Sequence, residues 1–132
     1  MDKTLTNPSY KVTGKMVLLT KGEYKGHKFA IIDFGKYPVA YVESKFTDIA
    51  IGDCDDERLM NITAHGGVTF YDRCYWDDSK DLYIGWDYGH YGDYIAMQGI
   101  DFDILRDNHK WTTPEILTDV VMVIEALAEK EG

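Results

Sequence analysis

The sequence has few cysteines and no long apolar runs, and both scarcities exclude classes of protein. Cys54 and Cys74 are the only cysteines in 132 residues, and they form no Cys-x-x-Cys pair. Their spacing matches neither a zinc motif nor a dithiol redox motif, and in a reducing cytosol we expect both thiols to stay free. No stretch approaches the ~20 apolar residues of a membrane span, and the first residues lack the apolar core of a signal peptide. We therefore expect a cytoplasmic protein without a membrane partner.

Positive charge is also scarce. The chain has 14 Lys and Arg against 23 Asp and Glu, for a net charge of −9. Domains that coat nucleic acid by counterion release are usually basic on at least one face, so we expect no direct coating of nucleic acid. The balance is uneven, because residues 1–36 have seven lysines and three acids whereas residues 37–132 have seven Lys and Arg and twenty acids. The first segment could meet an anionic ligand, and the second is either an ordinary solvated surface or a surface for a basic partner.

The apolar content is high enough for one core. Hydrophobic residues make up 45% of the chain and aromatic residues 14%, and a length of 132 residues fits a single domain. Residues 1–9 show no periodicity and contain Asn-Pro, so we expect them to be loosely ordered or merely docked on the domain. The rest of residues 1–132 is predicted to form one domain.

Short apolar runs predict an antiparallel sheet of about five or six strands. Runs at 16–19, 29–34 and 37–42 indicate a meander over residues 15–43, with the first turn in 21–26, where two glycines lie. Gly35-Lys36 has the length of a tight hairpin loop, and Pro38 favours an edge position for the third of these strands. Alternation of apolar and polar residues returns at 62–70 and again at 82–87. Between them, the acidic residues 44–60 predict a solvated loop, in which residues 53–57 lack the ligand spacing of a calcium loop.

The C-terminal region predicts one amphipathic helix near residues 113–130. Thr112 and Glu115 have the spacing of a capping box, and Pro114 is tolerated in a first helical turn. Apolar residues recur at helical spacing at Leu117, Val120, Val121, Ile124 and Leu127. The predicted fold is therefore α+β, an antiparallel sheet with this helix packed on one face.

Two segments combine residue types that a folding core does not require. Residues 64–70 contain His65 and two glycines, and residues 85–93 contain Asp87, His90 and Asp93 among glycines and aromatics. In a strand over 62–70, alternation places His65 and Thr69 on the face away from the core, and in the next strand it places Asp87 on the same side. The sequence thus predicts that His65 and Asp87 share one face of the sheet.

Such a cluster supports three interpretations. It could bind an anionic or nucleotide-like ligand, with glycine amides and imidazoles meeting phosphate and aromatic rings stacking on a base. The candidate binding residues are His65, Gly66, Gly67, Thr69, Tyr83, Trp86, Asp87, Tyr88, His90, Tyr91 and Asp93. It could instead hold a metal ion through His65, Asp87, His90 and Asp93, although their spacing matches no established motif. In the third interpretation His65 and Asp87 pair across a hairpin to set strand register, and the glycines serve turns.

An enzymatic role is an alternative to binding. No nucleophile lies in either segment apart from Thr69, because both cysteines are elsewhere. A His65–Asp87 general base in a hydrolase is then the simplest mechanism, with the aspartate orienting the imidazole ring. The sequence identifies no cofactor, and it leaves open whether the site lies within one chain or between two copies in a homo-oligomer.

The two segments together resemble a family of small phage and prophage proteins. The shared double motif is His-Gly-Gly-(Leu/Val)-Thr-(Tyr/Phe) followed by Gly-(Phe/Trp)-Asp-x-x-His-x-Gly-Asp, matched here by residues 65–70 and 85–93. The resemblance covers most of residues 28–130, but Trp86 and Tyr88-Gly89 stand where many members have Phe and a Cys-Ala pair. It implies an accessory protein in the host-cell cytoplasm that counteracts antiviral defence. Such a protein would sequester a nucleotide immune signal, or block a host defence protein through its acidic surface.

Overall fold

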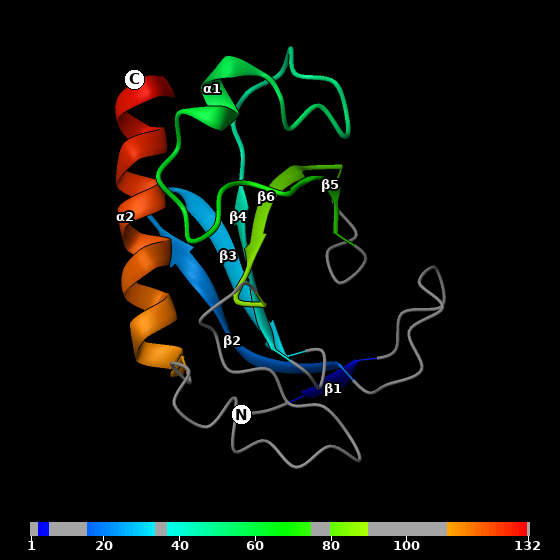
Figure 1. Cartoon of the computed structure of the whole chain (residues 1–132), viewed down its shortest axis with the longest axis vertical. Coiled ribbons are helices and arrows are strands. Elements are labelled where there is room, and N and C mark those ends of the chain that lie inside the picture. The colour runs from blue at the N-terminus through cyan, green and yellow to red at the C-terminus, as the bar shows by residue number, and fades with distance from the viewer. Residues whose placement is uncertain (1–2, 6–15, 34–36, 75–79, 90–110, 132) are drawn as a thin grey trace.

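A six-stranded antiparallel sheet with one long helix along a face forms the framework of the protein (Figure 1). The computed structural model describes residues 3–5, 16–33, 37–74, 80–89 and 111–131. The elements are β1 (Lys3–Leu5), β2 (Met16–Tyr24), β3 (His27–Asp33), β4 (Pro38–Glu43), α1 (Glu57–Met60), β5 (Phe70–Arg73), β6 (Leu82–Asp87) and α2 (Thr113–Glu131). The strand order is β1-β2-β3-β4-β6-β5. The predicted α+β fold, with about five or six strands and a C-terminal helix, is confirmed.

The hairpin between β2 and β3 turns at Lys25 and Gly26. Tyr24 pairs with His27 across a two-residue loop, and both loop residues have positive φ, 48° and 80°. Positive φ at both positions is typical of a type I′ turn, whose twist matches that of the flanking strands. Gly22, the other glycine of the predicted turn, lies inside β2 opposite Phe29, whose ring occupies the space that a Cβ at Gly22 would need.

Strand β4 lies in the middle of the sheet, between β3 and β6. The predicted edge position of this strand is therefore wrong. Pro38 is tolerated because it is the first residue of the strand, where a missing N–H interrupts little of the ladder. Its carbonyl oxygen accepts a hydrogen bond from Tyr88 N at 3.0 Å. Residues 3–5 form β1 and pair with β2, whereas the other residues of the segment 1–9 lie outside the described part of the chain.

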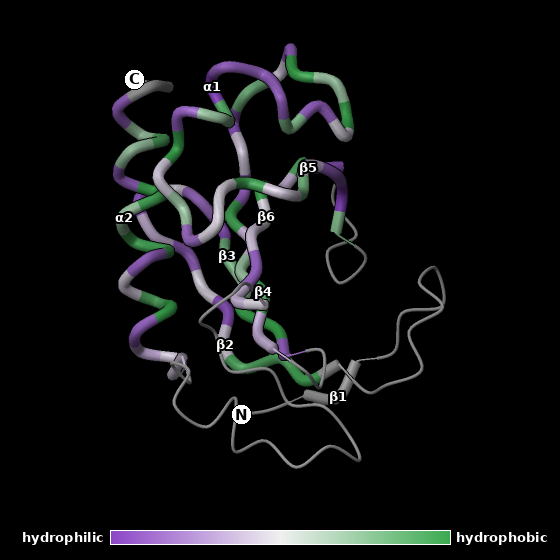
Figure 2. The backbone as a smooth tube through the Cα atoms, in the orientation of Figure 1, coloured by the Kyte–Doolittle hydropathy of each residue, from purple (hydrophilic) through white to green (hydrophobic). Residues whose placement is uncertain are grey.

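Helix α2 begins with the predicted capping box. Thr112 N donates to Glu115 Oε1 at 2.9 Å, and Glu115 N donates in return to Thr112 Oγ1 at 3.4 Å. The buried face consists of Ile116, Val120, Val123, Ile124 and Leu127. The predicted stripe shares three of these positions, Val120, Ile124 and Leu127. Its other two residues, Leu117 and Val121, are half-buried, and Ile116 and Val123 take their place. Along α2, hydrophobic and hydrophilic segments alternate, as expected of a helix with one buried face (Figure 2).

The sheet has apolar side chains on both faces. The face under α2 carries Ile31, Ala40, Val42, Ile84 and Trp86, which belong to one cluster with the buried residues of the helix. The opposite face carries a second cluster of Leu18, Ala30, Ile32, Tyr41, Cys74 and Tyr83. The predicted alternation in β6 is confirmed, because Ile84 and Trp86 lie in the first cluster and Tyr83 in the second.

The acidic segment 44–60 is a loop, as predicted, apart from the single turn of α1. Leu59 and Ile49 are buried and anchor it to the core. Arg58 ties the loop together by donating to Asp56 and Asp48, at 2.9 Å and 2.8 Å. Both cysteines are free, with Cys74 buried and Cys54 half-buried. In the part of the chain that the structure describes, no helix is long and apolar enough to cross a membrane.

Candidate functional site

The segment before β5 is a turn and not a strand. Gly67 N donates to Ala64 O at 2.9 Å, closing a β-turn, and Gly66 and Gly67 have φ values of 70° and 86°. Residues with L side chains rarely adopt these angles, and two successive residues with positive φ do not continue a regular β-strand. The predicted strand over 62–70 is therefore wrong, since of these residues only Phe70 belongs to β5. Gly66 and Gly67 therefore reverse the chain at this point.

The turn directs His65 toward α2. Its ring stacks on Tyr88, with centroids 4.6 Å apart and an interplanar angle of 11°, and it meets Trp111 edge-on at 4.8 Å. The prediction that His65 points away from the core is wrong. The reason is that strand alternation does not apply to a residue inside a turn.

The side chain of Asp87 lies on the face of the sheet opposite to α2 and His65. It follows Trp86 in β6, and because Trp86 packs under α2, alternation places the Asp87 side chain on the opposite face. There Asp87 Oδ1 accepts a hydrogen bond from Gly89 N at 3.0 Å. Partial burial, together with the negative charge of Asp87, raises the pKa of Tyr37. The predicted common face for His65 and Asp87 is thus wrong, and with it the geometric basis for a His65–Asp87 general base or register pair.

Three of the aromatic candidates are core residues. Trp86 and Tyr88 are 0% exposed and Tyr83 is 2% exposed, so none of these rings offers an open face to a ligand in this structure. Stacking of a base on these rings is therefore not supported. Thr69 is exposed, and its N–H donates to Gly85 O at 3.0 Å at the start of the β5–β6 pairing.

Two further glycines make room for the protein's own rings. A Cβ at Gly85 would lie 2.9 Å from Phe70 Cβ and 3.0 Å from Tyr41 Cδ1, and one at Gly89 would lie 2.8 Å from the Tyr37 ring. These positions are filled by side chains of the chain itself, so their glycines are explained without a ligand. His90, Tyr91 and Asp93 lie outside the described residues.

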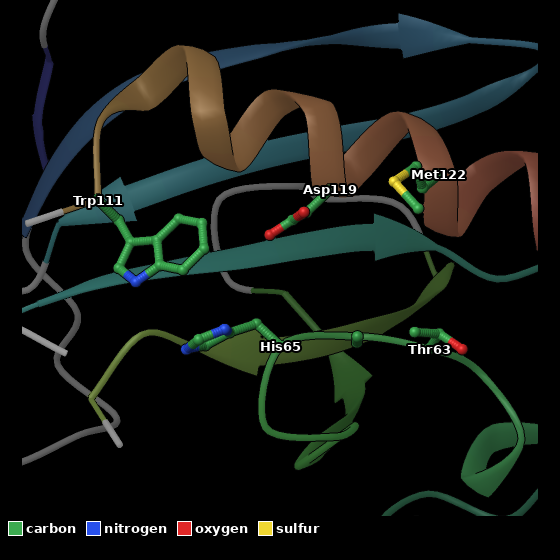
Figure 3. Close-up of a pocket in the computed structure, with 6 residues that line it drawn as sticks. Thr63, His65, Trp111, Asp119 and Met122 are labelled. Atoms are coloured by element: carbon green, nitrogen blue, oxygen red, sulfur yellow. The ribbon is translucent and has the colours of Figure 1, made fainter. Parts of the chain in front are cut away.

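A pocket opens where the 61–69 segment faces α2 (Figure 3). Its volume is about 230 Å³, and the described residues that line it are Thr63, Ala64, His65, Trp111, Asp119 and Met122. Trp111 and Asp119 come from the start and the middle of the C-terminal segment, whereas His65 comes from the turn on the other side (Figure 3). The pocket therefore exists only because two distant parts of the sequence meet.

A short hydrogen-bond chain runs from the core into this pocket. Trp86 Nε1 donates to the Tyr88 hydroxyl at 3.0 Å, and that hydroxyl donates to Asp119 Oδ2 at 2.6 Å. The Tyr88 ring also stacks on the ring of His65. It contacts the Trp111 ring as well, and the centroids of Tyr88 and Trp111 are 5.0 Å apart. One buried tyrosine thus positions all three of the aromatic and acidic groups that line the pocket.

Of the candidate binding residues that the structure describes, only His65 lies in the pocket lining. Sequence reasoning missed Asp119 and Trp111. A signal for Asp119 was present, because it is three residues after Ile116 and four before Val123, so a carboxylate lies beside the buried face of the helix. Nothing in the local pattern marked Trp111, which directly precedes the capping box.

A metal centre finds no support in the described part of the chain. No group of three or more His, Cys, Asp or Glu side chains lies close enough there to hold an ion. Of the predicted metal ligands, His65 and Asp87 lie on opposite faces of the sheet, and His90 and Asp93 are outside the described residues. Comparison of the chain with protein-family models, with curated proteins and with solved structures gave no match.

Proposed function

We propose that this protein binds a nucleotide-like ligand, with the base in the pocket between the 61–69 segment and α2. The observation that carries the proposal is the lining of this pocket, in which the imidazole of His65, the indole of Trp111 and the carboxylate of Asp119 converge. Ligand sites combine apolar and aromatic walls with a few placed polar groups, and this lining has that composition. Stacking on an aromatic side chain contributes roughly 1–3 kcal/mol per base.

The lining suits the base better than the phosphate. Among the described residues that form it, there is one carboxylate and neither a lysine nor an arginine. A phosphate next to Asp119 would be repelled, whereas the N–H groups of a base are attracted by a carboxylate. The sugar and phosphate of the ligand would then extend out of the open side of the pocket.

The biological role that we propose is sequestration of a nucleotide immune signal by a phage accessory protein. Its support is the resemblance of the double motif, residues 65–70 and 85–93, to small phage and prophage proteins. Sequestration needs a pocket that binds without reacting. Among the described lining residues there is neither a cysteine nor a serine, and the one hydroxyl is that of Thr63, which favours binding over covalent catalysis.

Native mass spectrometry and thermal shift against cyclic nucleotides and NAD-derived signals test this function. A sequestering protein raises its Tm with one of these ligands and releases the ligand intact, whereas a hydrolase returns it altered.

Trp111→Ala is expected to weaken binding by roughly 5- to 150-fold, because it removes a stacking surface. Met122→Ala tests the same pocket with little risk to folding, since Met122 is 58% exposed. Met60→Ala is the matched control, because Met60 is 66% exposed and lies on α1 outside the pocket lining.

Two results would contradict the proposal. One is a panel in which no nucleotide shifts the Tm of the unmodified protein. The other is capture of a host defence protein that survives His65→Ala but is lost on charge reversal within residues 53–57. That second result would identify the acidic loop, and not the pocket, as the functional surface.

A further inference from the structure

The hydrogen-bond chain that ends at Asp119 has a fixed direction. An indole N–H can only donate, so Trp86 Nε1 uses the oxygen of the Tyr88 hydroxyl as its acceptor. The single hydroxyl hydrogen of Tyr88 is then available for Asp119 Oδ2, at 2.6 Å. Trp86 and Tyr88 are both fully buried, so water does not compete for these groups. Residue 119 must therefore present an acceptor to Tyr88.

The rest of the Asp119 carboxylate serves the pocket. Oδ1 accepts no hydrogen bond from any residue that the structure describes, and the side chain reaches from α2 toward the space beside Trp111 and His65 (Figure 3). An ionised carboxylate has about four acceptor sites and no donor, and Tyr88 uses one of them. The pocket thus offers acceptors at this point, and a ligand edge made of donors satisfies them.

We propose that Asp119 makes the pocket selective for a base edge with two adjacent donors, as in guanine. This inference rests on the proposed binding of a nucleotide-like ligand. Guanine presents a ring N–H beside an exocyclic amino group, which matches the two oxygens of a carboxylate. Hypoxanthine lacks the amino group. Adenine places a ring acceptor beside its amino group, and that acceptor would face the lone pairs of Asp119.

An arginine side chain from a protein also presents two adjacent donors. The size of the pocket favours the base. Its volume of about 230 Å³ corresponds to roughly eight water molecules at liquid density, which is more than a guanidinium group fills. A purine stacked on Trp111 uses this space, so we take methylguanidinium as the competing probe.

Isothermal titration calorimetry with the full chain measures this selectivity. The probes are the monophosphates of guanosine, inosine and adenosine, and methylguanidinium. Loss of one hydrogen bond to a charged group corresponds to roughly a 10- to 100-fold change in affinity. We expect the guanosine nucleotide to bind at least roughly tenfold more tightly than the inosine nucleotide, and the adenosine nucleotide to bind more weakly still.

Asp119→Asn gives the sharper test, because the Tyr88 hydroxyl determines how the new amide lies. Its oxygen must accept from Tyr88, so its NH₂ group faces the pocket as a donor. The preference should then invert, with the adenosine nucleotide bound at least as tightly as the guanosine nucleotide. Asp53→Asn is the matched control, since it makes the same charge change on an exposed residue outside the pocket lining and should leave the guanosine preference unchanged.

The outcomes separate this inference from the function on which it rests. If the unmodified protein binds no nucleotide, both are wrong. If it binds nucleotides without preferring guanosine, or if Asp119→Asn weakens all of them equally, the selectivity is wrong and the binding function stands. Tighter binding of methylguanidinium than of every nucleotide would overturn the inference in favour of an arginine-bearing partner. The Tm of each variant is measured alongside, so that a loss of folding is recognised as such.

Discussion

Tyr88 connects the sheet, the pocket and the helix through a single side chain. Its ring stacks on that of His65, with centroids 4.6 Å apart, and its hydroxyl is hydrogen-bonded to both Trp86 and Asp119. A buried hydroxyl that both accepts and donates is strongly coupled to its neighbours, because losing it leaves two other polar groups without their partner. Tyr88, which follows Asp87 in the double motif, thus holds the pocket residues in place.

Tyr88→Phe is expected to lower the free energy of unfolding by about 1–3 kcal/mol, because the buried Trp86 N–H loses its acceptor. Urea denaturation followed by circular dichroism measures the change. Tyr71→Phe is the matched control: Tyr71 is equally buried, but among the described residues its hydroxyl has a single hydrogen bond, to Ser44 Oγ at 3.3 Å. A loss for Tyr88→Phe no larger than that for Tyr71→Phe would contradict the role of the hydrogen-bond chain.

At the scale of elements, α2 positions one wall of the pocket. Trp111 lies just before the helix and Asp119 on its second turn, so the point at which the helix begins determines where both side chains stand. The capping box between Thr112 and Glu115 sets that point. Ile116 N continues the pattern by donating to Thr112 O at 3.0 Å.

Removing the cap should destabilise the protein measurably. Thr112→Ala is expected to cost about 0.5–2 kcal/mol, because the N–H of Glu115 loses its side-chain acceptor. Thr118→Ala makes the same chemical change inside the helix, where the hydroxyl only donates back to Pro114 O at 3.1 Å. Since alanine has the higher helix propensity, this control should lie within about 0.5 kcal/mol of the unmodified protein or be more stable. Urea unfolding measures the free energy of unfolding of both variants. Equal losses of stability in Thr112→Ala and Thr118→Ala would contradict a stabilising role of the cap.

For the whole molecule, the excess of negative charge opposes compaction. The net charge is −9, and residues 48–57 concentrate five of the acids in one exposed loop, with Arg58 beside it as a partner for two of them. Salt screens self-repulsion of this kind. The Debye length, beyond which exposed charges interact little, is about 10 Å at 0.1 M and about 3 Å at 1 M ionic strength. We therefore expect this charge distribution to lower the stability of the fold at low ionic strength.

We expect the free energy of unfolding to rise with NaCl concentration, and to rise less steeply in a variant that combines Asp53→Asn with Asp55→Asn. Urea is the denaturant for this measurement, because guanidinium chloride is itself a salt. Both aspartates are exposed, so the substitutions leave the core unchanged. A stability that falls as salt is added would instead show that surface ion pairs, such as the one between Arg58 and Asp48, outweigh the repulsion.

The sequence by itself determined what depends on neighbours along the chain. The period of apolar residues predicted the α+β fold, the alternation in β6 and the helix that begins after Thr112, because these patterns follow from backbone geometry within a few residues. The sequence also predicted a turn near Lys25 and Gly26, where both residues have positive φ, although β2 continues past Gly22. Local rules failed at His65, since they cannot distinguish a glycine pair that bends the chain from one that lies in a strand.

Only the tertiary structure decided what surrounds each side chain. It turned His65 toward α2 and away from Asp87, and it filled the space at Gly85 with Phe70 and Tyr41. It also brought Asp119 and Trp111 to a turn more than forty residues earlier in the sequence. Contacts of this kind depend on how a sheet and a helix pack together, and no period or motif within one segment records that packing.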